Sequence, residues 1–224
     1  MGKSTFRYSA VLTVIALLVC NAYAQSGNGS PRDDTQWWND FQVTFPVSKK
    51  IDFNLLGGLR LGRDLSHFVN ERAGGSFTFK AGKYLSLSPG YLYIATQPVA
   101  GRKGYENRLM FAGTMRFPLG RFSVSDRNQF ERRFRNPIDS TRYRNRLQIE
   151  HPLKIDSVDL KLFASDEVYY DRSVNRWVRN RFSIGGGKTF NENLTIELYY
   201  LRQNDGLTRP GDVHAIGTAF RVRL

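Results

Sequence analysis

Apolar and polar residues alternate along almost the whole chain after its N-terminal region. In the last segment, Ile216, Phe220 and Val222 share one face, while Arg221 and Arg223 share the other. Because successive side chains of a β-strand point to opposite faces, this alternation predicts a strand with one apolar face and one polar face. No stretch beyond the N-terminal region keeps a sustained helical period. The pattern therefore predicts an all-β protein.

Eleven alternating segments follow one another from Gln36 to the final residue. Each is at least as long as the ~9–11 residues that a tilted strand needs to cross a bilayer. Tight turns alternate with longer, more polar loops, as the periplasmic turns and outer loops of outer-membrane barrels do. We therefore predict an antiparallel up-and-down transmembrane β-barrel of roughly 10–12 strands, with a periplasmic C-terminus. The predicted strands are 36–46, 50–62, 69–80, 84–97, 104–117, 121–134, 141–152, 158–170, 176–190, 194–204 and 212–224.

The strand number raises a question of parity. Bacterial barrels have even strand numbers, and eleven strands with a periplasmic C-terminus would start the first strand outside the cell. We therefore expect ten or twelve strands. The segment around Trp37 and Trp38 would then either not span the membrane or contain a second short strand.

The two faces of each predicted strand differ in polarity. In 104–117, for example, Leu109 and Phe111 oppose Arg108 and Arg116. A charged side chain on a lipid-facing surface costs ~2–4 kcal/mol at the midplane, so the charged faces are expected to point into the barrel. Segment 121–134 fits less well, because its polar face leaves Asp126 and Asn128 pointing at lipid. A β-bulge or a different register is the expected explanation.

The inward charges are the candidate functional site. One interpretation is a ladder of Arg–carboxylate pairs that fills a narrow barrel and fixes its register. The other is a basic passage or pocket for anions. The residues expected to line the lumen are Glu106, Arg108, Arg116, Arg127, Glu131, Arg133, Arg144, Arg146, Glu150, Glu167, Arg179, Arg181 and Glu197.

The N-terminus has the pattern of a secretory signal peptide. Lys3 and Arg7 precede a short apolar run, and Ala22-Tyr23-Ala24 is a small-x-small cleavage site. The run is too short for a membrane-spanning helix of ~20 residues. We therefore predict a signal peptide at 1–24, a flexible segment at 25–35 and the barrel at 36–224. A lipoprotein signal at Cys20 is the alternative, disfavoured by the bulky Val19 before it.

Charge and aromatic content agree with an exported barrel. The net charge is +13, but export and the dispersed arginines argue against nucleic-acid binding. The chain has 16 Phe, 11 Tyr and 3 Trp, and many are predicted near strand ends, where aromatic belts meet lipid headgroups. Basic residues in the predicted outer loops could pair with lipopolysaccharide phosphates. These are Arg63, Arg102, Lys103, Arg135, Arg172, Arg176 and Arg209.

Catalytic and metal-binding patterns are weak in this sequence. Ser66 precedes His67 in a predicted loop, but adjacency alone does not orient a Ser–His pair, and neither His151 nor His214 belongs to a motif. No metal-type Cys/His spacing or phosphate-loop motif occurs. We therefore expect no enzyme, metal or cofactor. A soluble lipocalin-like ligand-binding barrel, with its apolar face inward, and an outer-membrane lipid-modifying enzyme stay open as alternatives.

A series of short motifs, in this order along the chain, resembles a known family. They are Trp38, Arg60, Gly90-Tyr91, Glu106-Asn107-Arg108, Arg127 to Arg133, Tyr143 to Arg146, Asp166-Glu167 and Asn180-Arg181. The chain from about residue 36 to 224 is thereby similar to a bacterial outer-membrane β-barrel family, the domain-of-unknown-function 2490 family. The resemblance implies a barrel in the outer membrane of a Gram-negative bacterium, and it implies no activity.

The last strand resembles the C-terminal signal read by the barrel-assembly machinery. Gly217, Phe220 and Val222 have matching spacing, although Leu224 replaces the commoner phenylalanine. The expected partners are therefore outer-membrane lipid, lipopolysaccharide and that machinery. The expected role is structural or that of a narrow, anion-preferring pore for small solutes, and the oligomeric state stays open.

Overall fold

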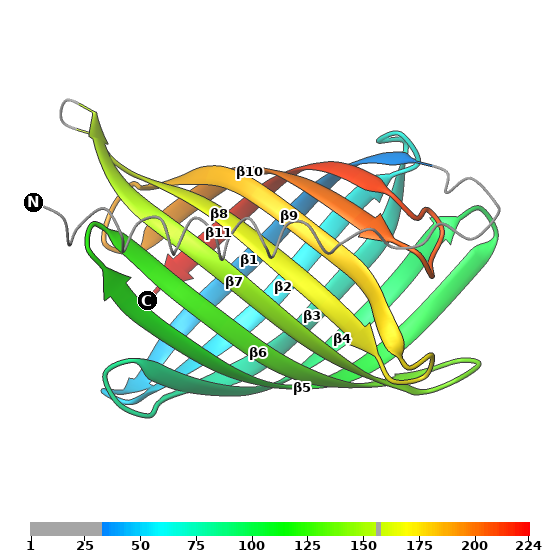
Figure 1. Cartoon of the computed structure of the whole chain (residues 1–224), viewed down its shortest axis with the longest axis horizontal. Coiled ribbons are helices and arrows are strands. Elements are labelled where there is room, and N and C mark those ends of the chain that lie inside the picture. Colours follow the sequence, from blue (N-terminus) through cyan, green and yellow to red (C-terminus); the bar gives the residue numbers. More distant parts are fainter. Residues whose placement is uncertain (1–32, 156–157) are drawn as a thin grey trace, which may run out of the picture.

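A computed structural model of the chain describes residues 33–155 and 158–224, and these residues form a closed barrel of eleven strands (Figure 1). The predicted signal peptide and residues 25–32 of the predicted flexible segment lie outside the described residues. The strands are β1 (Asp34–Ser48), β2 (Ile51–Gly62), β3 (His67–Lys80), β4 (Leu85–Val99), β5 (Arg102–Leu119), β6 (Phe122–Arg135), β7 (Ser140–Ile155), β8 (Val158–Asp171), β9 (Arg176–Thr189), β10 (Leu194–Asp205) and β11 (Val213–Arg223).

The predicted all-β fold and its strand segments are confirmed. Each predicted segment corresponds to one strand of the barrel, with ends that differ by only a few residues. The largest difference in a connection lies between β4 and β5, which extend to Val99 and Arg102 and replace most of an expected loop with hydrogen-bonded strand. No helix in the described part of the chain is long and apolar enough to cross a membrane.

The expectation of an even strand number was wrong. β1 spans the barrel as a full strand and pairs with β11 in parallel, from Asp34 opposite Val213 to Thr44 opposite Arg223. All other neighbouring strands are antiparallel. Strands joined by a hairpin must be antiparallel, but β1 and β11 are not joined by a hairpin. Their pairing can therefore be parallel or antiparallel, and either arrangement hydrogen-bonds their backbone groups and removes the sheet edges.

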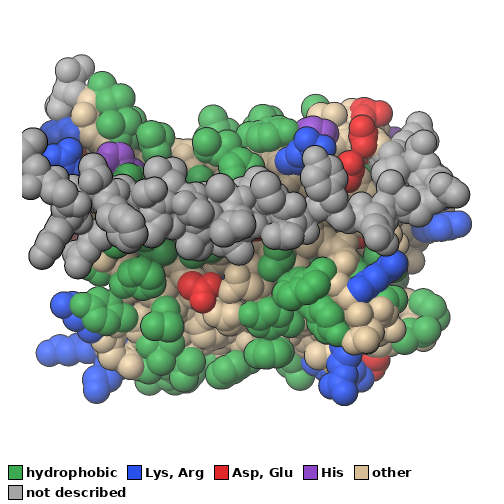
Figure 2. Space-filling model, viewed as in Figure 1, with side chains coloured by type: hydrophobic (Ala, Val, Ile, Leu, Met, Phe, Trp, Pro, Cys, Tyr) green, Lys and Arg blue, Asp and Glu red, His purple; other side chains and the backbone are tan. Residues whose placement is uncertain are grey.

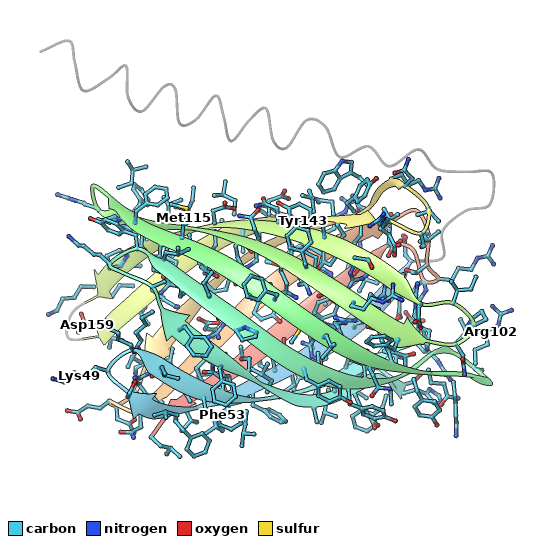
Figure 3. The ribbon with its side chains drawn as sticks, turned by 90° about the horizontal axis from the view of Figure 1, so that it is seen from below. Lys49, Phe53, Arg102, Met115, Tyr143 and Asp159 are labelled. Atoms are coloured by element: carbon cyan, nitrogen blue, oxygen red, sulfur yellow. The ribbon has the colours of Figure 1, made fainter. Side chains whose placement is uncertain are left out.

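The barrel has two distinct ends (Figure 1). At one end β1 begins and residues 206–212 join β10 to β11, and we call it the loop end. We call the turn end the one where β11 ends and where β1 is joined to β2 at Lys49 and Lys50. Figure 3 shows Lys49 and Asp159 at the turn end and Arg102 at the loop end.

Apolar side chains cover the outside of the barrel (Figure 2). Phe53, Met115 and Tyr143 point away from the wall in Figure 3. Phe111 is 50% exposed and Ile216 is 52% exposed, although both lie on fully paired strands. An apolar exterior is what a barrel in lipid requires. It is the opposite of the soluble lipocalin-like alternative, which would bury these side chains inside.

Aromatic rings pack against one another across strands on this exterior. Tyr93 and Tyr105 stack with 6.4 Å between ring centroids, and Trp177 meets the edges of Tyr143 and Tyr170 at 6.2 and 5.5 Å. These five aromatic residues lie in the halves of their strands nearer the loop end, as one of the predicted aromatic belts requires.

Asp126 and Asn128 do face outward, but the expected bulge is absent. β6 keeps an unbroken register with β5 and β7 through both residues. The Asn128 and Asn145 amides donate to the two oxygens of the Asp126 carboxylate, at 2.8 and 2.6 Å, and the Tyr143 hydroxyl donates to Asn128. Hydrogen bonding within this exterior group lowers the cost of placing polar side chains on an apolar surface.

Inside the barrel, glycine makes room for contacts between strands that are not neighbours. Gly58 on β2 lies between Asp40 on β1 and Arg72 on β3 in the strand register. A Cβ at Gly58 would lie 2.6 Å from both the Asp40 carboxylate and the Arg72 Nε. The Asp40–Arg72 ion pair therefore passes over β2 because residue 58 has no side chain.

Candidate functional site

A chamber of about 740 Å³ occupies the lumen from the turn end to the middle of the barrel. At the turn end, Gly82, Lys83 and Tyr84 line it, and near the middle its lining includes Trp38 and Arg181. Nine arginines and two lysines line the chamber, against three carboxylates. The charged lining consists of Arg60, Arg72, Arg108, Arg116, Arg127, Arg144, Arg146, Arg181, Arg221, Lys80 and Lys83, with Asp40, Glu167 and Glu197.

A network of buried ion pairs fills the lumen between the chamber and the loop end. Glu131 on β6 is its centre, with a side chain that is 0% exposed. One carboxylate oxygen accepts from Arg144 at 2.7 Å and lies 3.4 Å from the Arg108 Nη1, while the other lies 2.6 Å from the Arg142 Nη2. The Gln129 amide also donates to Glu131 at 2.7 Å. Three guanidinium groups thus share one carboxylate.

A second carboxylate extends this loop-end network. Glu106 pairs with Arg108 at 2.6 Å on its own strand and accepts two hydrogen bonds from Arg133 on β6. The Arg133 Nη1 also lies 3.4 Å from the Asp171 carboxylate on β8. Paired and hydrogen-bonded charges of this kind are the form in which charged groups tolerate burial. The loop-end network comprises Glu106, Arg108, Glu131, Arg133, Arg142, Arg144 and Asp171.

Tyr169 links the loop-end network to the chamber. Its side chain is fully buried, and its hydroxyl donates to Glu167 at 2.6 Å and accepts from Arg181 at 2.7 Å. The guanidinium groups of Arg142, Arg144, Arg179 and Arg181 lie between 4.7 and 5.4 Å from its ring centroid. An aromatic face attracts cations, so one tyrosine holds several arginines that repel one another.

Glu167 is the carboxylate at the end of the chamber that borders the loop-end network. It accepts from Arg144 at 2.7 Å and from Arg127 at 3.1 Å, in addition to Tyr169. Arg146 lies directly opposite Glu167 in the register of β7 and β8. Nevertheless, Arg146 forms no ion pair with any residue that the structure describes.

Ion pairs in the turn-end half join further strands along the inner face of the barrel wall. Glu197 on β10 binds Arg221 on β11 at 3.0 Å and Lys161 on β8 at 2.8 Å. Asp52 on β2 binds Arg223 at 3.0 Å and Lys80 at 3.0 Å. The Arg223–Asp52 pair joins β11 to β2 across β1, so it reinforces the parallel closure of the barrel.

The structure places all thirteen predicted lumen residues on inward-facing positions, but it does not bring them all together. Arg116 lines the chamber near the turn end. Glu150 forms a separate ion pair, with its Oε1 3.6 Å from the Lys161 Nζ. Arg179 pairs with Asp205 near the loop end. Seven of the predicted residues meet in or beside the loop-end network: Glu106, Arg108, Arg127, Glu131, Arg133, Arg144 and Glu167.

Several important lumen residues were not among those predicted. Arg142 lies on the polar face of its strand, so alternation alone could have identified it. Asp171 continues the inward face of β8 beyond the predicted strand end, and Tyr169 shares that face but is not charged. Asp40 and Arg72 are also inward-facing, and only the barrel geometry brings them together across Gly58.

Each of the three histidines contacts a neighbouring side chain in the described part of the chain. The Ser66 hydroxyl lies 2.7 Å from the His67 Nδ1 on the exposed loop end, but the same hydroxyl donates to the Arg63 carbonyl at 2.6 Å. His214 bonds to the Tyr200 hydroxyl on the exterior, and His151 packs against Phe122. No group of three or more His, Cys, Asp or Glu side chains suited to a metal occurs in residues 33–155 and 158–224.

Comparison with known proteins assigns the chain to a family. The family model described as "Protein of unknown function (DUF2490)" matches residues 35–213, which is most of the barrel. The chain belongs to this family. The resemblance carried by the short motifs is therefore confirmed. No curated protein matches the chain.

Two solved structures similar to this DUF2490 barrel are also β-barrels. One is an anion-selective porin from Comamonas acidovorans, with 15% identity and a TM-score of 0.34, over 75% of this chain and 55% of the porin. The other is a siderophore receptor from Pseudomonas aeruginosa, with 13% identity and a TM-score of 0.28, over 72% of this chain and 32% of the receptor. The chain thus spans about half the length of the porin and a third of the receptor.

Proposed function

We propose that this DUF2490 protein is an outer-membrane β-barrel whose lumen is a narrow, anion-preferring passage for small solutes. The charge imbalance of the chamber carries the proposal, because eleven basic side chains face three carboxylates in its lining. A lumen lined by one sign of charge concentrates ions of the opposite sign and excludes ions of its own sign. The apolar exterior supports the membrane location, since it would be unfavourable in water.

The loop-end network sets the size of solute that this proposal allows. Its buried charged side chains lie between the chamber and the loop end, so the chamber does not extend as far as the loop end. Solutes that pass must therefore be small, and passage must follow water between the ion pairs. In the same proposal, the basic residues of the loop end would bind lipopolysaccharide phosphates. One of them, Arg63, donates a hydrogen bond to the Gln97 carbonyl at 2.8 Å.

Single-channel recording of the refolded chain tests the pore. In a planar bilayer with a potassium chloride gradient, we expect discrete openings with a reversal potential of the sign for chloride preference. The double variant Lys83→Gln with Arg116→Gln removes two positive charges from the chamber near the turn end and should move the reversal potential toward zero. Arg132→Gln, on the exposed exterior, should leave it unchanged.

A purely structural barrel is the second candidate, and the loop-end network favours it. Glu131, Asp171 and Tyr169 are fully buried, so solvent does not reach these side chains in this part of the lumen. Insertion of the folded barrel without any conductance would support this second role and contradict the pore. Openings that prefer potassium would contradict the anion preference.

A further inference from the structure

Two arginines of the chamber lie opposite each other, and of the two only Arg127 forms an ion pair with a described residue. Arg127 on β6 and Arg146 on β7 are directly opposite in the strand register, and both line the chamber. Like charges directly opposite each other on neighbouring strands destabilise a sheet. In the loop-end network, by contrast, the Glu106 and Glu131 carboxylates bridge the guanidinium groups.

The hydrogen-bonding capacity of this pair is largely unused. The Nε atoms of Arg127 and Arg146 are both buried and have no hydrogen-bond partner among the described residues. Among the residues that the structure describes, Arg127 has a single ion pair, with Glu167 at 3.1 Å, and Glu167 is already shared with Arg144. A buried donor without a partner is costly, so the site favours a ligand that supplies acceptors.

Arg60 shows how the fold deals with a similar arginine by another route. Its Nε is also buried without a hydrogen-bond partner, but its guanidinium lies 3.6 Å from the centroid of the Trp38 ring. Neither Arg127 nor Arg146 lies over an aromatic ring among the described contacts. The Arg127–Arg146 pair therefore lacks both a carboxylate of its own and an aromatic face.

We propose that Arg127 and Arg146 form a binding site for a phosphate group inside the chamber. The planar guanidinium presents donors in a fork that matches the oxygens of phosphate, and two facing guanidinium groups suit an anion with several acceptor oxygens. A chloride ion offers one centre and no such geometry. The chamber, at about 740 Å³, has room for the group attached to a small organic moiety as well as for free phosphate.

This site rests on the proposed function only in that it lies in the same chamber. It adds a ligand class, because a lumen can prefer anions through its average charge without holding any of them. A bound phosphate would add a second anion, beside Glu167, to the arginines at the boundary between the chamber and the loop-end network, where Glu167 alone is shared by Arg127 and Arg144.

Isothermal titration calorimetry of the refolded chain in detergent tests the site, with inorganic phosphate and glycerol 3-phosphate as separate probes in chloride buffer. We expect one molecule of phosphate per barrel. Arg127→Gln and Arg146→Gln should each weaken binding by about tenfold or more, since each removes a charge-assisted bond. Lys83→Gln removes the same charge from the chamber lining near the turn end and should change the affinity less than about twofold. Binding of glycerol 3-phosphate as well would identify the phosphate group, and not the free ion alone, as the ligand.

Thermal unfolding is a second test, and it separates loss of the phosphate site from a general loss of stability in a variant. Phosphate should raise the unfolding temperature of the unsubstituted barrel but not that of Arg146→Gln. Arg146→Gln should itself unfold at a higher temperature without phosphate, because it relieves the repulsion from Arg127. Equal affinities for all three variants, or no phosphate binding, would overturn the site while leaving chloride preference in the bilayer experiment intact.

Discussion

Replacement of Glu131 by glutamine is expected to lower the free energy of unfolding by about 3–5 kcal/mol. Arg108, Arg142 and Arg144 all share the Glu131 carboxylate, whose side chain has no exposed surface. Glutamine keeps the shape but removes the negative charge, so three buried guanidinium groups lose their common partner. Urea-induced unfolding of the refolded barrel in lipid vesicles, followed by tryptophan fluorescence, measures the change.

The exposed pair of Arg132 and Asp139 provides the matched control. These side chains are 3.2 Å apart and are 48% and 42% exposed. Asp139→Asn makes the same chemical change in water, where an ion pair contributes about 0–1 kcal/mol. If Glu131→Gln were as mild as Asp139→Asn, the loop-end network would not be what stabilises this part of the lumen.

Replacement of Gly74 by alanine is the second large effect that we expect. An added Cβ would lie 2.1 Å from the Tyr91 carbonyl oxygen and 2.8 Å from the Leu92 Cα, both in the backbone of β4. A backbone atom cannot move aside as a flexible side chain does, so β3 and β4 must separate. Overpacking in a well-packed site typically costs about 1–3 kcal/mol, and contact with backbone places Gly74→Ala at the upper end.

Gly113→Ala is the control for this second prediction. Gly113 also lies in a paired strand of the barrel, but a Cβ there would meet only the Leu87 Cδ2 at 3.8 Å, an ordinary van der Waals contact. Folding yield and the shift in mobility between heated and unheated samples in detergent electrophoresis report on both variants. Equal yields of the two folded proteins would show that the wall of β3 and β4 relaxes without cost.

Strand positions and facing could be predicted from the sequence because both depend on a local period of two. Alternation in β5, for example, is enough to send Phe111 outward and Arg108 inward. The same rule showed correctly that Asp126 faces outward. The sequence did not reveal that neighbouring amides satisfy its carboxylate, because that depends on which strands are adjacent and in which register.

Strand number and ion-pair partners could not be predicted in the same way. Ten or twelve strands followed from a general rule about parity, whereas β1 closes the barrel in parallel with β11. Arg144 and Arg146 are equivalent in the pattern, yet Arg144 bridges Glu131 and Glu167 while Arg146 forms no ion pair within residues 33–155 and 158–224. The choice of ion-pair partner depends on the distances between long side chains that reach into the same lumen. One sequence contains no direct record of those distances.

The parallel pairing of β1 with β11 determines how the chain is threaded. Ten strands can be grouped into five consecutive hairpins, β2 with β3 through β10 with β11, and β1 is the strand left over. The chain enters the wall at Asp34 on the loop end and leaves it at Arg223 on the turn end. An odd number of strands therefore separates the two ends of the barrel-forming segment, so in the proposed membrane location peptides fused ahead of Asp34 and after Leu224 would face opposite compartments.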